Sequence, residues 1–178
     1  SLSASNGLLI RDRAAFEPAR RLDAVVFDKT GTLTEGRFGV TDIVLLQEGD
    51  ESQELAFAAA AESQSEHPIA HGIVAEAKRR GIALPKASEV SNITGEGIVA
   101  VVGDVRVRIV SPGHLARQGN AITHERLGQL ESAGKTVVVL ERDGQARALF
   151  ALADIVRPES KEAIAELTRL GIRSVMLT

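Results

Sequence analysis

Apolar residues near the two ends of the chain form short, uninterrupted runs. Residues 24–27 (Ala-Val-Val-Phe) contain no polar residue, which is typical of a strand buried on both faces of a sheet. Near the other end, Pro158 and Gly171 mark the limits of a helix over 159–170. Residues 172–178 are expected to form another buried strand. A strand followed by a turn, and a helix followed by a strand, indicate an α/β domain.

Between these ends the period of the apolar positions changes. Two pairs of largely apolar segments flank Gly-Asp or Asp-Gly turns, and residues 105–109 alternate apolar residues with arginines, which predicts β-hairpins. The paired segments are 99–102 with 105–109, and 136–140 with 146–152. Caps and helix limits predict three helices, from Asp50 or Ser52 to about Ser63, from Pro68 to Gly81, and over 123–133. We therefore expect an α/β domain, residues 1–40 and 149–178, interrupted by an α+β domain with an antiparallel sheet, residues 41–148.

Composition narrows the class of protein. The 178 residues are 44% hydrophobic with a formal net charge of −3, as in soluble globular proteins of one or two small domains. The chain has five Phe and neither Trp nor Tyr, so it lacks base-stacking surfaces and we expect no nucleic-acid partner. It has no Cys, which excludes disulfides and thiolate metal sites. No apolar run approaches the ~20 residues of a membrane-spanning helix.

The first candidate for chemistry is the turn that follows residues 24–27. It reads Asp-Lys-Thr-Gly-Thr from residue 28 and places the Asp28 carboxylate at the end of a strand, where it can act as a nucleophile. Backbone N–H groups of such a turn can bind a phosphoryl oxygen, and magnesium can bridge carboxylate and phosphate. Lys29 adds positive charge, and Gly31 permits close approach of the backbone. A polar turn in which Asp28 only ends the strand is the alternative interpretation.

The seven residues from Asp28 to Thr34, Asp-Lys-Thr-Gly-Thr-Leu-Thr, resemble the phosphorylation signature of P-type ATPases. The resemblance implies a haloacid-dehalogenase-like, Rossmann-like phosphorylation domain in which Asp28 takes the γ-phosphoryl group of ATP. It also implies that Asp28 and the backbone carbonyl of Thr30 bind Mg²⁺, with Lys29 beside them in the catalytic turn. Phosphatases of this fold usually carry a second Asp at the position of Thr30. Threonine cannot transfer a proton near neutral pH, so an aspartyl phosphate is expected to persist, as a pump requires.

A second candidate site lies in the expected insertion. Pro68 as the first helical residue would place His67 at the helix cap, where its imidazole can face a ligand. A histidine at a helix start is also a common capping or surface residue. Gly95 and Gly97 form a Gly-x-Gly turn, which by itself marks only a tight turn or a bulge.

In this order after the phosphorylation motif, these signals resemble the nucleotide-binding domain of heavy-metal-transporting P-type ATPases. The resemblance implies that Glu62 hydrogen-bonds the adenine edge and that His67 orients the ring. It implies that Gly95 and Gly97 let the backbone approach the nucleotide. The family often has Gly-Asn where this chain has Ser-Pro, so Ser111 is the candidate for that contact. The Val-Ser-Pro-Gly form of residues 110–113 looks more like the copper-exporting B-type branch.

The return to the first domain carries a third candidate group. Asp154 and Arg157 resemble the hinge motif of the family, which implies contacts with ribose or phosphate; capping of the following helix is the alternative. Thr178 falls where the family has the Thr of Thr-Gly-Asp, whose hydroxyl helps to bind the phosphoryl group. The Gly-Asp, a later Lys and the aspartates that complete the magnesium site do not follow in this sequence. Both ends are expected to be cut, since the last strand stops at its C-terminal tip, where parallel sheets bind ligands.

Taken together, the sequence predicts the ATP-binding and aspartyl-phosphorylation region of a heavy-metal, by preference copper, translocating P-type ATPase. The expected cofactors are ATP and Mg²⁺. The expected partners are the membrane, actuator and remaining phosphorylation-domain segments of the same pump, at the cytoplasmic side of the plasma membrane. The transported ion is expected to bind outside this chain, which by itself should bind nucleotide without full turnover. The alternatives are a soluble haloacid-dehalogenase-like phosphatase with a cap domain and a nucleotide-binding regulatory module.

Overall fold

The computed structural model describes residues 21–93 and 95–177, so the expected role of Thr178 lies outside the described residues. Its elements are β1 (Ala24–Asp28), β2 (Thr34–Leu45), α3 (Glu51–Glu62), α4 (Pro68–Arg79), β3 (Ala87–Ile93), β4 (Gly97–Val102), β5 (Val105–Val110), α5 (Pro112–Arg117), α6 (Glu125–Ser132), β6 (Thr136–Arg142), β7 (Gln145–Val156), α7 (Pro158–Arg169) and β8 (Arg173–Leu177). The mixed α/β class and the antiparallel hairpins predicted from the sequence are confirmed.

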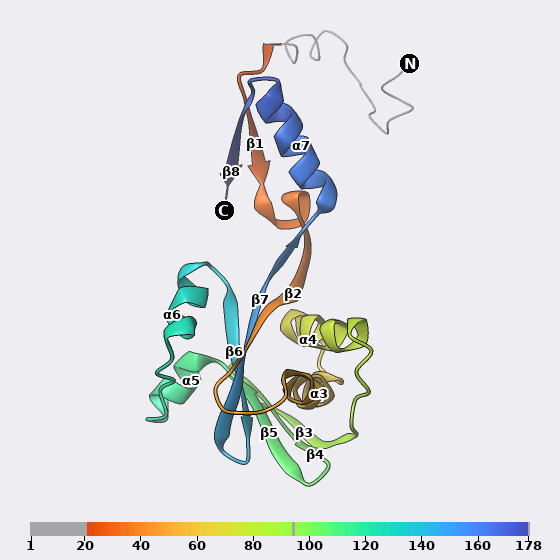
Figure 1. Cartoon of the computed structure of the whole chain (residues 1–178), viewed down its shortest axis with the longest axis vertical. Helices are drawn as coiled ribbons and strands as arrows, with labels where there is room; N and C mark the ends of the chain where they lie inside the picture. The colour runs from red at the N-terminus through yellow and green to blue at the C-terminus, as the bar shows by residue number, and fades with distance from the viewer. Residues whose placement is uncertain (1–20, 94, 178) are drawn as a thin grey trace. The chain divides into compact units, whose positions relative to one another are not determined.

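Residues 37–155 form one compact unit built on a six-stranded sheet of order β2-β7-β6-β5-β4-β3. The expected insertion, residues 41–148, lies inside this unit. Helices α3 and α4 cover one face of the sheet, and α5 and α6 cover the other (Figure 1). Because alternate residues of a strand point to opposite faces, neighbouring residues of β6 contribute to different cores. Val138 packs in the core under α3 and α4, whereas Val137 and Val139 pack in the core under α5 and α6.

Helix α3 is the most deeply buried helix of this unit. Its alanines 58–61 are at most 1% exposed, so small side chains let the helix lie close to the sheet. The Asp50 carboxylate accepts a hydrogen bond from the Ser52 N–H at 3.0 Å, which is the predicted N-cap. The helix ends at Glu62, so its position also decides where the Glu62 carboxylate lies.

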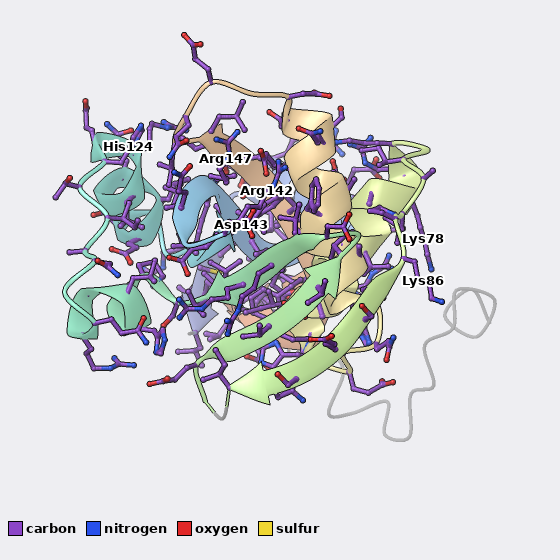
Figure 2. The ribbon with its side chains drawn as sticks, turned by 90° about the horizontal axis from the view of Figure 1, so that it is seen from below. Lys78, Lys86, His124, Arg142, Asp143 and Arg147 are labelled. Atoms are coloured by element: carbon purple, nitrogen blue, oxygen red, sulfur yellow. The ribbon has the colours of Figure 1, made fainter. Side chains whose placement is uncertain are left out.

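A buried ion cluster fixes α3 to the β6–β7 hairpin. Glu54, which is 0% exposed, accepts from Arg142 Nη1 at 3.0 Å and from Arg147 Nε at 3.2 Å. The Arg142 guanidinium also lies 4.0 Å from the centre of the Phe57 ring, a favourable cation–π geometry. Figure 2 shows both arginines reaching toward α3 from the end of the hairpin.

The second unit comprises residues 1–36 and 156–178, of which 21–36 and 156–177 are described. Strands β1 and β8 pair in parallel, and α7 connects back to β8. The strands are as predicted, but their expected burial is wrong: Val26 is 56% exposed, and Met176 and Leu177 are 53% and 60% exposed. Among the described residues these two strands form a sheet of their own, so they lack the further strands and layers that bury a parallel sheet on both faces.

Within the part of the chain that the structure describes, no helix has the length and apolar character needed to cross a membrane.

Candidate functional site

The turn after β1 is held by Thr34, the last residue of the motif that begins at Asp28. Thr34 Oγ1 donates to the Lys29 carbonyl at 3.0 Å and accepts from the Gly31 N–H at 3.2 Å. The Thr34 N–H donates to the same Lys29 carbonyl. Gly31 has φ +79°, a conformation that glycine adopts without the steric cost of a side chain. Thr34 was not among the predicted site residues, although its hydroxyl closes the turn.

Arg157 braces this turn from the other side. Its Nε donates to the Thr34 carbonyl at 3.0 Å, and its backbone N–H donates to the Leu33 carbonyl at 3.0 Å. A second guanidinium nitrogen lies 3.5 Å from the Gly31 carbonyl. The Arg157 side chain therefore stabilises the backbone that carries Asp28.

Asp154 makes a comparable contact inside the unit 37–155. Its Oδ1 accepts from the Arg37 N–H at 3.1 Å, which joins the end of this unit to its beginning. Neither Asp154 nor Arg157 is among the residues that line the cavity described below. Their expected contacts with ribose or phosphate stay a prediction.

The oxygen atoms of the turn suit a phosphorylation site. Asp28 is the last residue of β1, and its side chain is exposed, so a phosphate can approach it. A carboxylate and a backbone carbonyl, here from Asp28 and Thr30, are ligands that Mg²⁺ accepts while it keeps waters and phosphate oxygens as further ligands. These residues therefore fit the ion that the sequence predicts.

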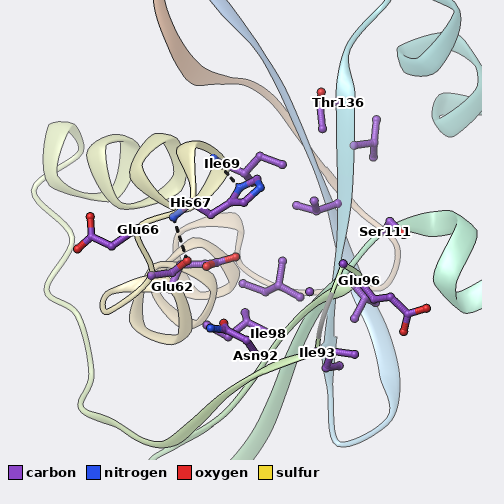
Figure 3. A pocket seen from close by; sticks show the side chains of 17 residues that line it. Glu62, Glu66, His67, Ile69, Asn92, Ile93, Glu96, Ile98, Ser111 and Thr136 are labelled. Carbon is purple, nitrogen blue, oxygen red and sulfur yellow. Dashed lines mark hydrogen bonds between the residues drawn. The ribbon is translucent and has the colours of Figure 1, made fainter.

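A cavity of about 520 Å³ opens inside the unit 37–155. It brings together five of the candidate residues, which come from four separate segments (Figure 3): Glu62, His67, Gly95, Gly97 and Ser111. Its walls are mostly aliphatic, with Ile98, Ile109 and Val138 of three neighbouring strands among them. A flat apolar group with a polar edge fits such a cavity.

Glu62 is the buried acid of the cavity. Its side chain is 7% exposed, and burial raises its pKa to about 7, against a hydrogen bond from Ser65 that lowers it. Near neutral pH the protonated and ionised forms are therefore similarly populated. The carboxyl group can donate a hydrogen bond in one form and only accept in the other.

His67 caps α4 and faces the cavity at the same time. The ring Nδ1 of His67 accepts from the Ile69 N–H at 3.2 Å. The backbone N–H of His67 donates to Ser65 Oγ at 3.3 Å. Since Nδ1 accepts, the proton of the neutral ring lies on Nε2. Figure 3 shows the ring extending from the start of α4 into the cavity. The two interpretations of this histidine, a cap and a ligand-facing group, are thus compatible.

The second glycine of the turn between β3 and β4, Gly97, is required by the packing of the sheet. Gly97 pairs with Val110 and has φ +155°. A Cβ on Gly97 would lie 2.0 Å from the Ile109 carbonyl oxygen, much closer than atoms can approach. The neighbouring strand therefore requires a glycine here, whatever the cavity binds.

Two further residues line the cavity. One of them also caps a helix, and the other was not predicted. Ser111 caps α5, a helix that was not predicted from the sequence, and its Oγ accepts from the His114 N–H at 3.2 Å. Asn92 on β3 lines the cavity and lies on the same side as Glu62 in Figure 3. No motif contains Asn92, so the sequence offered no signal for it.

Comparisons with known proteins identify the family of the chain. Residues 22–178 match the family model of the haloacid dehalogenase-like hydrolases. The chain is 51% identical, over its whole length, to the copper-exporting P-type ATPase B of Archaeoglobus fulgidus, of which it covers 26%. It spans about a quarter of the length of the curated relatives it matches.

Solved structures give the same picture. A zinc-transporting PIB-type ATPase in its E2·Pi state superposes with a TM-score of 0.86 at 39% identity, over 99% of this chain and 29% of the other. The catalytic domain of the CPx-ATPase CopB-B, which was studied for conformational changes upon nucleotide binding, superposes with a TM-score of 0.64 at 27% identity. That match covers 98% of this chain and 61% of the other.

Proposed function

The chain belongs to the haloacid dehalogenase-like hydrolases and, within them, to the heavy-metal-transporting P-type ATPases, and from this premise we propose that it binds ATP in the cavity beside Glu62 and His67 and accepts the γ-phosphoryl group on Asp28. The observation that carries the proposal is the convergence of an acid, a histidine and a glycine turn on one aliphatic cavity.

The adenine ring lies between the aliphatic wall and His67. Burial of a flat apolar ring against Ile98 and Val138 supplies most of the affinity. Glu62 meets the exocyclic amine and ring nitrogen of the base, and its pKa of about 7 lets it accept from one and donate to the other. His67 Nε2–H donates to the nucleotide. Gly95, Gly97 and Ser111 line the side of the cavity along which the sugar and phosphates of the bound nucleotide extend.

Phosphoryl transfer takes place at the turn after β1. A carboxylate oxygen of Asp28 forms a bond to the γ-phosphorus, and the bond from that phosphorus to the β–γ bridging oxygen breaks, so ADP leaves with the electron pair. Lys29 and the N–H groups of the turn stabilise the negative charge that develops on the phosphoryl oxygens. Mg²⁺, held by Asp28 and the Thr30 carbonyl, supplies further positive charge when bound. Thr30 offers no general base, so the aspartyl phosphate is long-lived.

The complete pump uses this phosphorylation to export a metal ion, by preference copper, across the plasma membrane. The similarity to copper-exporting relatives supports this choice of ion. This chain lies on the cytoplasmic side of the membrane. Its partners there are the actuator, the membrane segments and the rest of the phosphorylation domain. Asp154 and Arg157 contact ribose or phosphate, and Thr178 binds the phosphoryl group. Alone, the chain binds nucleotide without full turnover.

Labelling of the complete pump with γ-labelled ATP tests the role of Asp28. The unaltered pump should form an acid-stable, hydroxylamine-sensitive phosphoenzyme, because an acyl phosphate reacts with hydroxylamine. Asp28→Asn should abolish the label, whereas Asp23→Asn, a nearby exposed aspartate, should leave it. Label that survives in Asp28→Asn would exclude the proposed nucleophile. A phosphatase would instead hydrolyse small phosphate esters, and a regulatory module would form no phosphoenzyme.

Titration of the chain with ATP tests the role of His67 in the cavity. His67→Asn keeps a capping oxygen near the position of Nδ1 but removes the Nε2–H donor. We expect about tenfold weaker binding, as for the loss of one hydrogen bond to the ligand and of the ring contact. His71→Asn is the matched control, because His71 lies on the same helix but is not among the residues that line the cavity. Equal affinities for the two variants would remove His67 from the site.

A further inference from the structure

The residue between the two glycines of the cavity is tied to α5. Glu96 Oε2 lies 2.6 Å from His114 Nδ1, and Glu96 Oε1 accepts from Arg117 Nη2 at 3.0 Å. The pKa of Glu96 is lowered by the Arg117 guanidinium and by His114, so the carboxylate is ionised at neutral pH. The Ser111 N–H also donates to the Glu96 carbonyl at 3.2 Å. Side chain and backbone of Glu96 are thus both held by the segment 111–117.

The charged carboxylate of Glu96 points away from the cavity. Figure 3 shows its carboxylate directed away from Glu62 and His67, although its backbone lines the cavity. A carboxylate aimed at the phosphates of ATP would repel them. Its orientation instead suits the fixing of the turn to α5.

His114 is the buried member of this arrangement, and its surroundings define its protonation. The residue is 6% exposed. Its Nε2 lies 3.2 Å from Arg108 Nη2, and Arg108 also pairs with the buried Glu141 at 2.9 Å. A guanidinium can only donate, so in the neutral ring Nε2 accepts and the proton lies on Nδ1, facing Glu96. This Nδ1 contact is short, but its angle departs from that of an aligned hydrogen bond.

We propose that His114 is a positioning residue: in its neutral, Nδ1-protonated form it holds Glu96 and so fixes the glycine turn against which the nucleotide binds. This inference rests on the proposed ATP site. A turn with glycine on both sides of Glu96 has many accessible backbone conformations when it is not held. Ordering them on binding costs affinity, and a turn that is already held avoids this cost.

Two substitutions separate the two sides of the ring. The amide of Asn can occupy the position of Nδ1, so His114→Asn keeps a donor toward Glu96. The amide of Gln reaches the position of Nε2, so His114→Gln keeps an acceptor for Arg108 and loses the donor toward Glu96. We expect His114→Asn to bind ATP within about twofold of the unaltered chain, and His114→Gln to bind about 3- to 10-fold more weakly.

Amide hydrogen exchange in the absence of nucleotide gives a second measurement. The Glu96 N–H donates to the Ile93 carbonyl at 2.9 Å, and the Ser111 N–H donates to Glu96. Both amides should exchange faster in His114→Gln than in His114→Asn, while the two variants unfold at similar temperatures. Equal exchange rates, or equal ATP affinities in the two variants, would overturn the role of His114.

The unaltered protein supplies a measurement that does not depend on the folding of a variant. Nitrogen chemical shifts of the His114 ring should report a neutral imidazole protonated on Nδ1; a proton on Nε2 would overturn the inference. If the unaltered chain bound no ATP, the proposed function would fail, while the ring shifts and the amide exchange would still decide whether His114 holds the turn.

Discussion

The protonation and hydrogen bonding of residues in the cavity depend on neighbours whose positions cannot be predicted from the sequence. Glu62 and His67 could be selected from the sequence as candidates, but the protonation of each depends on packing. Burial at the end of α3 raises the pKa of Glu62 to about 7. The cap contact with Ile69 places the His67 proton on Nε2. The sequence therefore suggests candidate residues, whereas their hydrogen-bonding capacity depends on the folded surroundings.

The raised pKa of Glu62 makes folding stability depend on pH. A carboxyl group with a folded pKa of about 7 and a reference value of 4.5 is most compatible with the fold when protonated. Its stabilising contribution is complete below pH 4.5 and is lost as the pH rises through about 7. The loss is on the order of 3 kcal/mol.

Urea denaturation between about pH 5 and pH 8 measures this effect, and Glu62→Gln should remove most of the pH dependence over that range. Glu66→Gln is the control, because the Glu66 side chain is 98% exposed. Parallel stability curves for Glu62→Gln and the unaltered chain would mean that Glu62 is not the group responsible.

At the scale of elements, regular periodicity was predictable and irregular segments were not. The two hairpins and the helices α3, α4, α6 and α7 lie close to their predicted limits. Strand β3 was missed because a register shift between Ser88 and Ser91, with Glu89 at φ +51°, interrupts its alternation. Helix α5 has only six residues, too few to show a helical period.

These missed elements explain the gaps in the predicted site. Asn92 lies on β3, and His114 lies on α5, the helix that Ser111 caps. The predicted burial of β1 and β8 was wrong for a related reason. An apolar run indicates a strand, but burial on both faces also requires neighbouring strands and covering layers.

The ion cluster between α3 and the β6–β7 hairpin should dominate the stability of this contact. Glu54→Gln leaves Arg142 and Arg147 without their shared carboxylate, so we expect the free energy of unfolding to fall by about 3 kcal/mol. Chemical denaturation measures the change. Glu166→Gln breaks an exposed pair with Arg169 and should cost less than about 0.5 kcal/mol. Similar losses of unfolding free energy in the two variants would show that the buried cluster contributes no more to stability than an exposed ion pair.

At the scale of the whole molecule, the cavity beside Glu62 and His67 belongs to one self-contained unit. Both hydrophobic cores consist of residues between 37 and 155, and so does the lining of the cavity. The Arg37 N–H donates to Asp154, so the unit begins and ends at one place. An inserted domain with adjacent ends can fold without the chain that flanks it.

A protein that consists of residues 37–155 alone should therefore fold and bind ATP. We expect one cooperative unfolding transition and an ATP affinity within about threefold of the affinity of the whole chain. Calorimetric titration of the two proteins provides the comparison, with His67→Asn in the shorter protein as the control for binding at the same site. Noncooperative unfolding, or a much lower affinity, would mean that the flanking segments contribute to the fold or to the cavity.

Gly97 also bears on how this site can be traced through evolution. Since a side chain at Gly97 would collide with the Ile109 carbonyl, selection for the sheet alone preserves the glycine. A descendant that had lost ATP binding would still keep it, so its retention in a homologue carries no information about ligand. Loss of the nucleotide would instead leave its trace at Glu62, whose ionised form the fold disfavours, and at His67, where Asn can also cap α4.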